Sequence, residues 1–205
     1  MRLYFHFAIF ASLLTIAVPA GEAAPRGGLL QGIRIAEPAY DADYDRVRDY
    51  GTWLRARGTR CYNVRDQVLV RDNVGRIRTE PVSGGRCKVV GGRWKEPYAA
   101  MEVTDADDME IDHMVPLKEA HISGAHAWSR QKRGQYANFI QRKNHLIAVY
   151  GRENSSKSDR DDYDPPNPRF KCMYVKHWID VKRRWKLTMD RHEADMIRSR
   201  YDAYC

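Results

Sequence analysis

Two short apolar runs with polar residues placed at their ends constrain this chain more than any other feature. The first covers residues 109–117, where the carboxylate of Asp112 and the imidazole of His113 stand side by side. The second covers residues 146–149 and leads through Gly151 into a polar segment that contains the amide of Asn154. A short apolar run bounded by turn residues is typical of a buried segment. The stretch therefore predicts buried elements that carry a carboxylate, an imidazole and an amide.

Those three side-chain types fit the hydrolysis of a phosphodiester. Hydrolysis needs a base that deprotonates water and a cation that stabilises charge on the phosphate and on the leaving oxygen. Histidine is suited to the role of base because its unperturbed pKa is about 6.5. Asp and Asn oxygens suit a hard ion such as Mg²⁺, which usually keeps several waters. The pattern indicates a hydrolase site with one metal ion.

The same stretch resembles the HNH endonucleases, in which two strands and a helix surround one divalent ion. The closest likeness is to a secreted branch that reads Asp-His-x-x-Pro-Leu and later Asn-x-Ser-Lys-x-Asp, similar to the C-terminal nuclease domain of GmrSD-type restriction enzymes. Residues 112–117, 146–149 and 154–159 fit this branch in order and spacing. Residues 124–128 and 136–138 are also similar to it.

The resemblance implies a role for each matching residue. His113 would be the general base. Asp112 and Asn154 would hold one divalent ion, with Mg²⁺ expected rather than Mn²⁺ or Zn²⁺. His145 occupies the middle position of the motif, which orients the base, and a shift of one residue would give that position to Asn144. Lys157 lies one helical turn beyond Asn154 and is expected to contact a phosphate or the scissile group.

Each of these residues also has a plainer interpretation. Asp112 could be a salt-bridge partner, His113 or His145 a structural histidine, Asn154 a helix cap and Lys157 a solvated charge. Neighbouring residues on a regular strand point to opposite faces. Asp112 and His113 can therefore serve one site only if the strand ends or bends near them, as the following proline allows.

The start of the chain has the pattern of an export signal. Residues 1–24 hold one basic residue, a long apolar run without acids and small residues suited to cleavage, as in a secretory signal peptide. An uncleaved membrane anchor is the alternative. Residues 25–38 are expected to form a flexible leader and residues 39–205 one nuclease domain, with its core motif at 109–161. The mature protein is thus expected to be extracellular or periplasmic, without stable membrane association.

The balance of charges favours a polyanionic partner. The formal net charge is +8, and the expected signal peptide contributes nothing to it. Nucleic acid is the expected substrate, with DNA favoured over RNA, although heparin-like polymers fit the charge as well. Arg142 and Lys143 are the expected substrate contacts near the motif. A second basic set surrounds two expected strands and could equally be an ordinary solvated surface: Arg60, Arg65, Arg71, Arg76, Arg78, Arg86, Lys88, Arg93 and Lys95.

Four cysteines agree with export to an oxidising compartment. An even number without a Cys-x-x-Cys pair indicates two disulfides rather than a zinc site. Three pairings can be drawn. We expect Cys61–Cys87 and Cys172–Cys205, because each of these pairs flanks one local unit.

The remaining patterns predict an α+β fold in which helices surround a small antiparallel β unit that carries the ββα-metal motif. Apolar spacing and breakers predict helices at 40–57, 117–122, 126–141, 169–186 and 190–204. Strands are predicted at 64–71 and 86–94, with a Gly84-Gly85 turn before the second. The apolar stripe of the 169–186 helix is expected to lie in the core.

The sequence thus favours a secreted, metal-dependent endonuclease with low sequence specificity, because no base-reading element is recognisable. A secreted binding protein for nucleic acid or another polyanion, with the same fold but without turnover, is the alternative from another class. A hydrolase of small-molecule or lipid phosphodiesters fits the basic surface less well.

Overall fold

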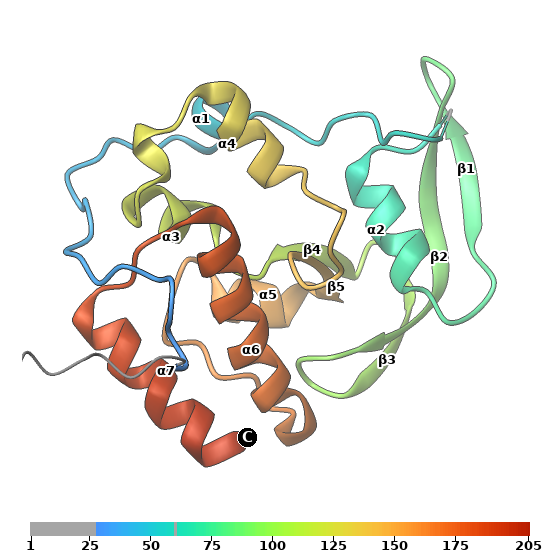
Figure 1. Cartoon of the computed structure of the whole chain (residues 1–205). Coiled ribbons are helices and arrows are strands. Elements are labelled where there is room, and N and C mark those ends of the chain that lie inside the picture. Colours follow the sequence, from blue (N-terminus) through green and yellow to red (C-terminus); the bar gives the residue numbers. More distant parts are fainter. Residues whose placement is uncertain (1–27, 60) are drawn as a thin grey trace, which may run out of the picture.

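The structure is a computed structural model that describes residues 28–59 and 61–205. The expected signal peptide at 1–24 lies outside the described residues. The α-helices are α1 Arg46–Tyr50, α2 Val64–Asp72, α3 Leu117–Ile122, α4 Arg130–Ala137, α5 Gly151–Lys157, α6 Pro168–Trp185 and α7 Arg191–Tyr204, and η1 Ala125–Ala127 is a 3₁₀ turn. The strands are β1 Arg78–Val82, β2 Arg86–Glu96, β3 Met101–Asp105, β4 Met109–His113 and β5 Leu146–Tyr150. The expected α+β class is confirmed (Figure 1).

One sheet is antiparallel, with its strands in the order β1-β2-β3. Gly84 and Gly85 connect β1 to β2 and have φ angles of 73° and 66°, a conformation that glycine adopts without steric cost. The expected turn and the expected strand that follows it are therefore confirmed. The Cys61–Cys87 disulfide, also confirmed, ties this sheet to the segment before α2.

The strand predicted at 64–71 is wrong, because this segment forms helix α2. The side chain of Asn63 accepts a hydrogen bond from the amide of Asp66 and so caps the helix. Val64, Val68 and Leu69 are buried on one side. Their spacing fits a helical face, and it outweighs the β propensity of the valines.

The second sheet is the β4–β5 pair, which runs from Met109↔Tyr150 to His113↔Leu146. Helix α5 begins at Gly151, directly after β5, and contacts both strands. These three elements lie in the centre of the molecule, between α6 and α7 on one side and α2 with the larger sheet on the other (Figure 1). The chain thus brings two antiparallel strands and a helix together in the order that the sequence suggested.

Both faces of the β4–β5 pair are buried. Ile147 and Val149 belong to the core cluster that includes α6 and α7. Leu146 and Ala148, which point the other way, belong to the cluster that includes α2 and β2. The pair is therefore held between two cores, which explains why its second strand reads as a continuous apolar run.

The two C-terminal helices are confirmed. Asn167 caps α6 and Asp190 caps α7, and the Cys172–Cys205 disulfide joins the beginning of the first to the end of the second. No helix in residues 28–59 and 61–205 is long and apolar enough to cross a bilayer.

Three expectations about other segments need correction. The described part of the supposed flexible leader, residues 28–38, is held against the α6–α7 junction, where Ile35 forms a bridge with Met189. The helix predicted at 40–57 is only α1, because the chain turns at Gly51 with a φ of 77°. The helix predicted at 126–141 begins later, since Ser129 caps α4, and it ends at Ala137.

Candidate active site

The end of β4, the start of α3 and one side of α5 enclose a cavity of about 340 Å³. Asp112, His113 and Asn154 all line it. The structure therefore brings together the three residues that the sequence proposed as ligands and base. Tyr44, Arg46, Lys118 and Asp159 complete its polar wall.

Asp112 and His113 reach this cavity from opposite sides of the strand, because β4 ends at His113 and the chain then turns into α3 at Pro116. The carboxylate of Asp112 points toward α5, and the ring of His113 points toward the end of α4. The strand end thus resolves the geometric difficulty that two neighbouring strand residues pose.

Three hydrogen bonds hold the Asp112 carboxylate in place. The ammonium of Lys157 lies 2.7 Å from Oδ1 and 2.9 Å from Oδ2, and the hydroxyl of Tyr98 donates to Oδ2. Only 4% of Asp112 is exposed. Burial raises the pKa of Asp112, and the neighbouring Lys157 charge opposes that rise. The carboxylate is therefore rigidly oriented at the inner wall of the cavity.

Lys157 is completely buried, and all three of its donors are engaged. Besides the two Asp112 oxygens, its ammonium donates to the backbone carbonyl of His113 over 2.8 Å. The sequence interpretation placed this side chain against a phosphate. The structure places it beneath the strand end, where it joins α5 to β4 and neutralises Asp112. Burial lowers the pKa of Lys157, against the attraction of the carboxylate.

His113 is held in one tautomer. Its Nε2 lies 2.9 Å from the carbonyl oxygen of Ala137, which can only accept, so Nε2 carries the proton. Nδ1 is then the unprotonated nitrogen. Trp53 stacks on the ring with a centroid separation of 5.5 Å and an interplanar angle of 5°. Burial lowers the pKa of His113 well below its usual value, so the ring is neutral at pH 7.

His145 makes a similar contact with the residue that precedes Ala137. Its Nε2 donates to the carbonyl of Tyr136 over 2.7 Å, and burial lowers its pKa to about 4. The carbonyls of Tyr136 and Ala137 belong to the last turn of α4, where backbone acceptors lack helical partners. His145 therefore contacts the helix end that orients His113, whereas the side chain of Asn144 turns away to Asp180.

Asn154 presents an oxygen to the cavity. Its amide nitrogen donates to Oε2 of Glu110 over 2.6 Å, and a carboxylate can only accept. The amide orientation is thereby fixed, and Oδ1 remains available as a ligand.

The donor set suits a hard cation that the protein holds at few points. Within the residues that the structure describes, no three His, Cys, Asp or Glu side chains form a metal cluster. A carboxylate offers about four lone-pair positions, of which three are used at Asp112, and Asn154 adds a free oxygen. Mg²⁺ is commonly bound through one or two side chains, several waters and the phosphates of its substrate. The residues present fit such an ion.

Arg142 and Lys143 do not line this cavity. They lie at a second and larger cavity on the side of β5, where Lys143 is 3.6 Å from Asp72. The cations that line the candidate site are instead Arg46 and Lys118, and Lys118 forms an ion pair with Asp159. Lys118 directly follows the first apolar run and could have been suspected, but nothing in the sequence links Arg46 to it.

Comparison with known proteins identifies the family of this chain. Residues 64–199 match the family described as GmrSD restriction endonucleases, C-terminal domain. The chain belongs to this family. The match spans α2 to α7 and includes every site residue named above except Tyr44, Arg46 and Trp53. As a GmrSD C-terminal domain, the chain carries a nuclease-type domain.

An uncharacterized secreted protein of Arthroderma benhamiae is 31% identical over 206 residues, which cover 96% of this chain and 97% of the relative. The two disulfides of this GmrSD C-terminal domain agree with a location outside the cytosol. No solved structure matches the chain.

Proposed function

We propose that this protein is a secreted, metal-dependent endonuclease of the HNH type that cleaves nucleic acid with low sequence specificity. The observation that carries the proposal is the state of His113. The imidazole is fixed by the Ala137 carbonyl with Nδ1 unprotonated, and His113 lines a cavity that Asp112 and Asn154 also line. That arrangement suits a general base.

In the proposed reaction, Nδ1 of His113 removes a proton from water, and the oxygen of that water attacks the phosphorus. The bond from phosphorus to the 3′ oxygen breaks, and this oxygen takes a proton from solvent water, which leaves a 5′-phosphate and a 3′-hydroxyl. His113 becomes an imidazolium and later returns the proton to solvent. A neutral resting state suits this role, since a protonated ring could not accept the proton.

Asp112 and Asn154 would hold the divalent ion, with Mg²⁺ favoured by their oxygen ligands. The ion supplies positive charge for the phosphate and the leaving oxygen. Lys157 and Tyr98 hold Asp112 in one orientation, and the Asn154–Glu110 contact fixes the amide. The protein thus prepares both ligands before substrate binds.

His145 is a positioning residue in this proposal. Its bond to Tyr136 holds the last turn of α4, and the next carbonyl of that turn orients His113. Arg46 and Lys118, which line the cavity, are the cations closest to an incoming phosphate. The net charge of +8 supports a polyanionic substrate.

The test is cleavage of plasmid DNA and of RNA by the purified mature protein with Mg²⁺, Mn²⁺, Zn²⁺ or EDTA. His113→Ala is compared with His192→Ala, which removes an exposed histidine on α7. We expect metal-dependent cutting that is lost in the first variant and retained in the second. Binding of nucleic acid without cutting under any metal would overturn the proposal in favour of a non-catalytic binding protein.

A further inference from the structure

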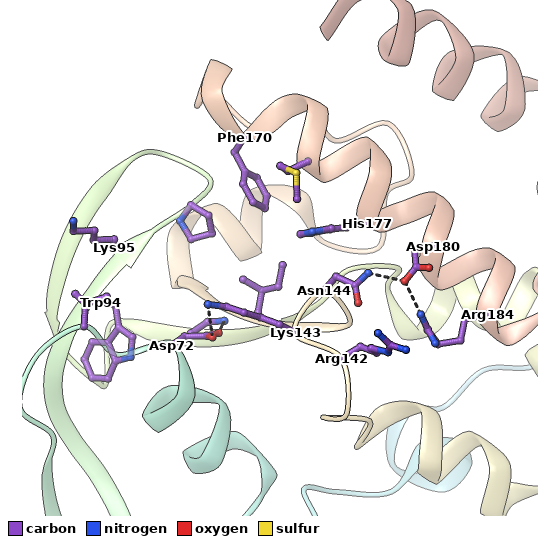
Figure 2. A pocket seen from close by; sticks show the side chains of 15 residues that line it. Asp72, Trp94, Lys95, Arg142, Lys143, Asn144, Phe170, His177, Asp180 and Arg184 are labelled. Atoms are coloured by element: carbon purple, nitrogen blue, oxygen red, sulfur yellow. Dashed lines mark hydrogen bonds and ion pairs between the residues drawn. The ribbon is translucent and has the colours of Figure 1, made fainter. Parts of the chain in front are cut away.

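A second cavity, of about 700 Å³ against about 340 Å³ for the candidate active site, lies at β5, the other strand of the β4–β5 pair. Ile147 and Ala148 of β5 form part of its wall, and α6 covers it from the other side (Figure 2). Its volume lies in the range of about 300–1,000 Å³ that small-ligand sites occupy.

One part of this cavity is apolar and aromatic. Phe170, Met173 and His177 lie along one side of α6 and line it. The rings of Phe170 and His177 meet edge to face, with centroids 5.9 Å apart. The sequence assigned all three to a core stripe, but Met173 is 44% exposed, while Tyr174 and Trp178 of the same stripe are buried. This side of α6 therefore borders a cavity, although Phe170 also packs against the core.

The cavity also carries an excess of positive charge. Lys95, Arg142, Lys143 and Arg184 line it, against the two carboxylates Asp72 and Asp180. Both carboxylates already have cationic partners, since Asp72 contacts Arg71 and Lys143, and Asp180 contacts Arg184. Among the described residues, Lys95 and Arg142 form no close ion pair. An anionic group would compensate them.

His177 adds an unmet polar group. Its Nδ1 is buried without a hydrogen-bond partner in the described part of the chain. Figure 2 shows Phe170 and His177 directed from α6 toward the strand pair, with Arg142 and Arg184 gathered at one end. Flat rings and cations at one end suit a ligand that has a planar ring system and an anionic group.

We infer that this cavity binds a nucleotide, with its base against Phe170 and His177 and its phosphate toward Arg142. The inference rests on the proposed function only for the source of the ligand, which is either a free 5′-mononucleotide released by cleavage or an unpaired nucleotide within a substrate strand. An alkyl anion would satisfy the charge, but it would offer no flat ring to Phe170 and His177.

The test measures binding of 5′-dAMP and 5′-AMP in EDTA by calorimetry, so that no metal ion recruits phosphate to the candidate active site. Arg142→Glu and Met173→Glu change exposed or rim positions of the cavity. Met173→Leu and Arg191→Glu are matched controls, the second at an exposed arginine of α7. We expect both glutamate variants in the cavity to weaken binding at least about tenfold. The controls and His113→Ala should bind as the wild type does.

Competition by other ligands identifies the source. Displacement of the mononucleotide by a single-stranded oligonucleotide, but not by a duplex, indicates an unpaired nucleotide of a strand, and displacement by neither indicates a free nucleotide. Absence of mononucleotide binding at about 10 mM would overturn the inference. So would equal binding of decyl phosphate, or loss of binding in His113→Ala. None of these outcomes depends on cleavage, so the inference and the proposed function can fail separately.

Discussion

Lys157→Met should destabilise the protein severely while leaving the aliphatic stem of the side chain in place. The change removes three donors, two to Asp112 and one to the His113 carbonyl, at a position with no solvent exposure. Asp112 would remain buried with only the Tyr98 hydroxyl as a donor. Loss of one partner from a buried ion pair costs about 3–5 kcal/mol, because the remaining charge is left without compensation.

The assay is urea unfolding at pH 7 with both disulfides intact. A loss of that size is a large fraction of the roughly 5–15 kcal/mol that stabilises a typical domain. In a chain of this length it corresponds to a fall in Tm of about 10 °C. Lys176→Met, at an exposed lysine of α6, serves as the matched control and should stay within about 0.5 kcal/mol of the wild type.

A double variant separates the unpaired charge from lost packing. In Asp112→Asn/Lys157→Met neither side chain is charged, so at least half of the lost stability should return. A loss below about 1 kcal/mol in the single variant would refute the reasoning. A double variant that is no more stable than Lys157→Met would do the same.

Three further outcomes are expected. Because burial holds the pKa of His113 well below its usual value, kcat/KM for cleavage should stay level between about pH 5.5 and 7.5, and a tenfold fall toward the lower pH, as expected for the usual pKa of about 6.5, would contradict this. Burial raises the pKa of Glu193 against the opposing charge of Lys182, so its contribution to stability is present below its usual pKa of about 4.5 and lost as the pH rises above that value. Urea titrations should therefore show Glu193→Gln gaining stability relative to the wild type as the pH rises from about 4.5 to about 8, and a constant difference would refute this. Replacement of Cys61 and Cys87 by serine should cost about 3 kcal/mol in the same assay, and an unchanged midpoint would contradict it.

The parts of the fold that could be predicted are those whose signals are local. Apolar spacing and breakers were sufficient to place α6 and α7, and the two disulfides follow from cysteines that flank local units. The segment that became α2 was misjudged because three valines suggested a strand. The cap at Asn63 and the packing of the segment against β2 and β5 stabilise the helix instead.

The candidate site divides in a similar way. The motif was sufficient to predict that Asp112, His113 and Asn154 lie together, and all three line one cavity. The group that orients His113 is the backbone carbonyl of Ala137. Because every residue has such a carbonyl, the pattern of side chains cannot predict which one accepts this hydrogen bond. Lys157 was misplaced because helical spacing gives the side of a helix but not what that side packs against.

The position of the β4–β5 pair between two cores also bears on how the protein would lose activity. Since alternate residues of β5 are anchored in different cores, neither core can melt without releasing one face of the strand that pairs with Asp112 and His113. Thermal inactivation should then coincide with global unfolding, and no partly melted species should retain the geometry of the site. A protein with this arrangement would keep the geometry of the site completely or lose it completely as conditions become harsher.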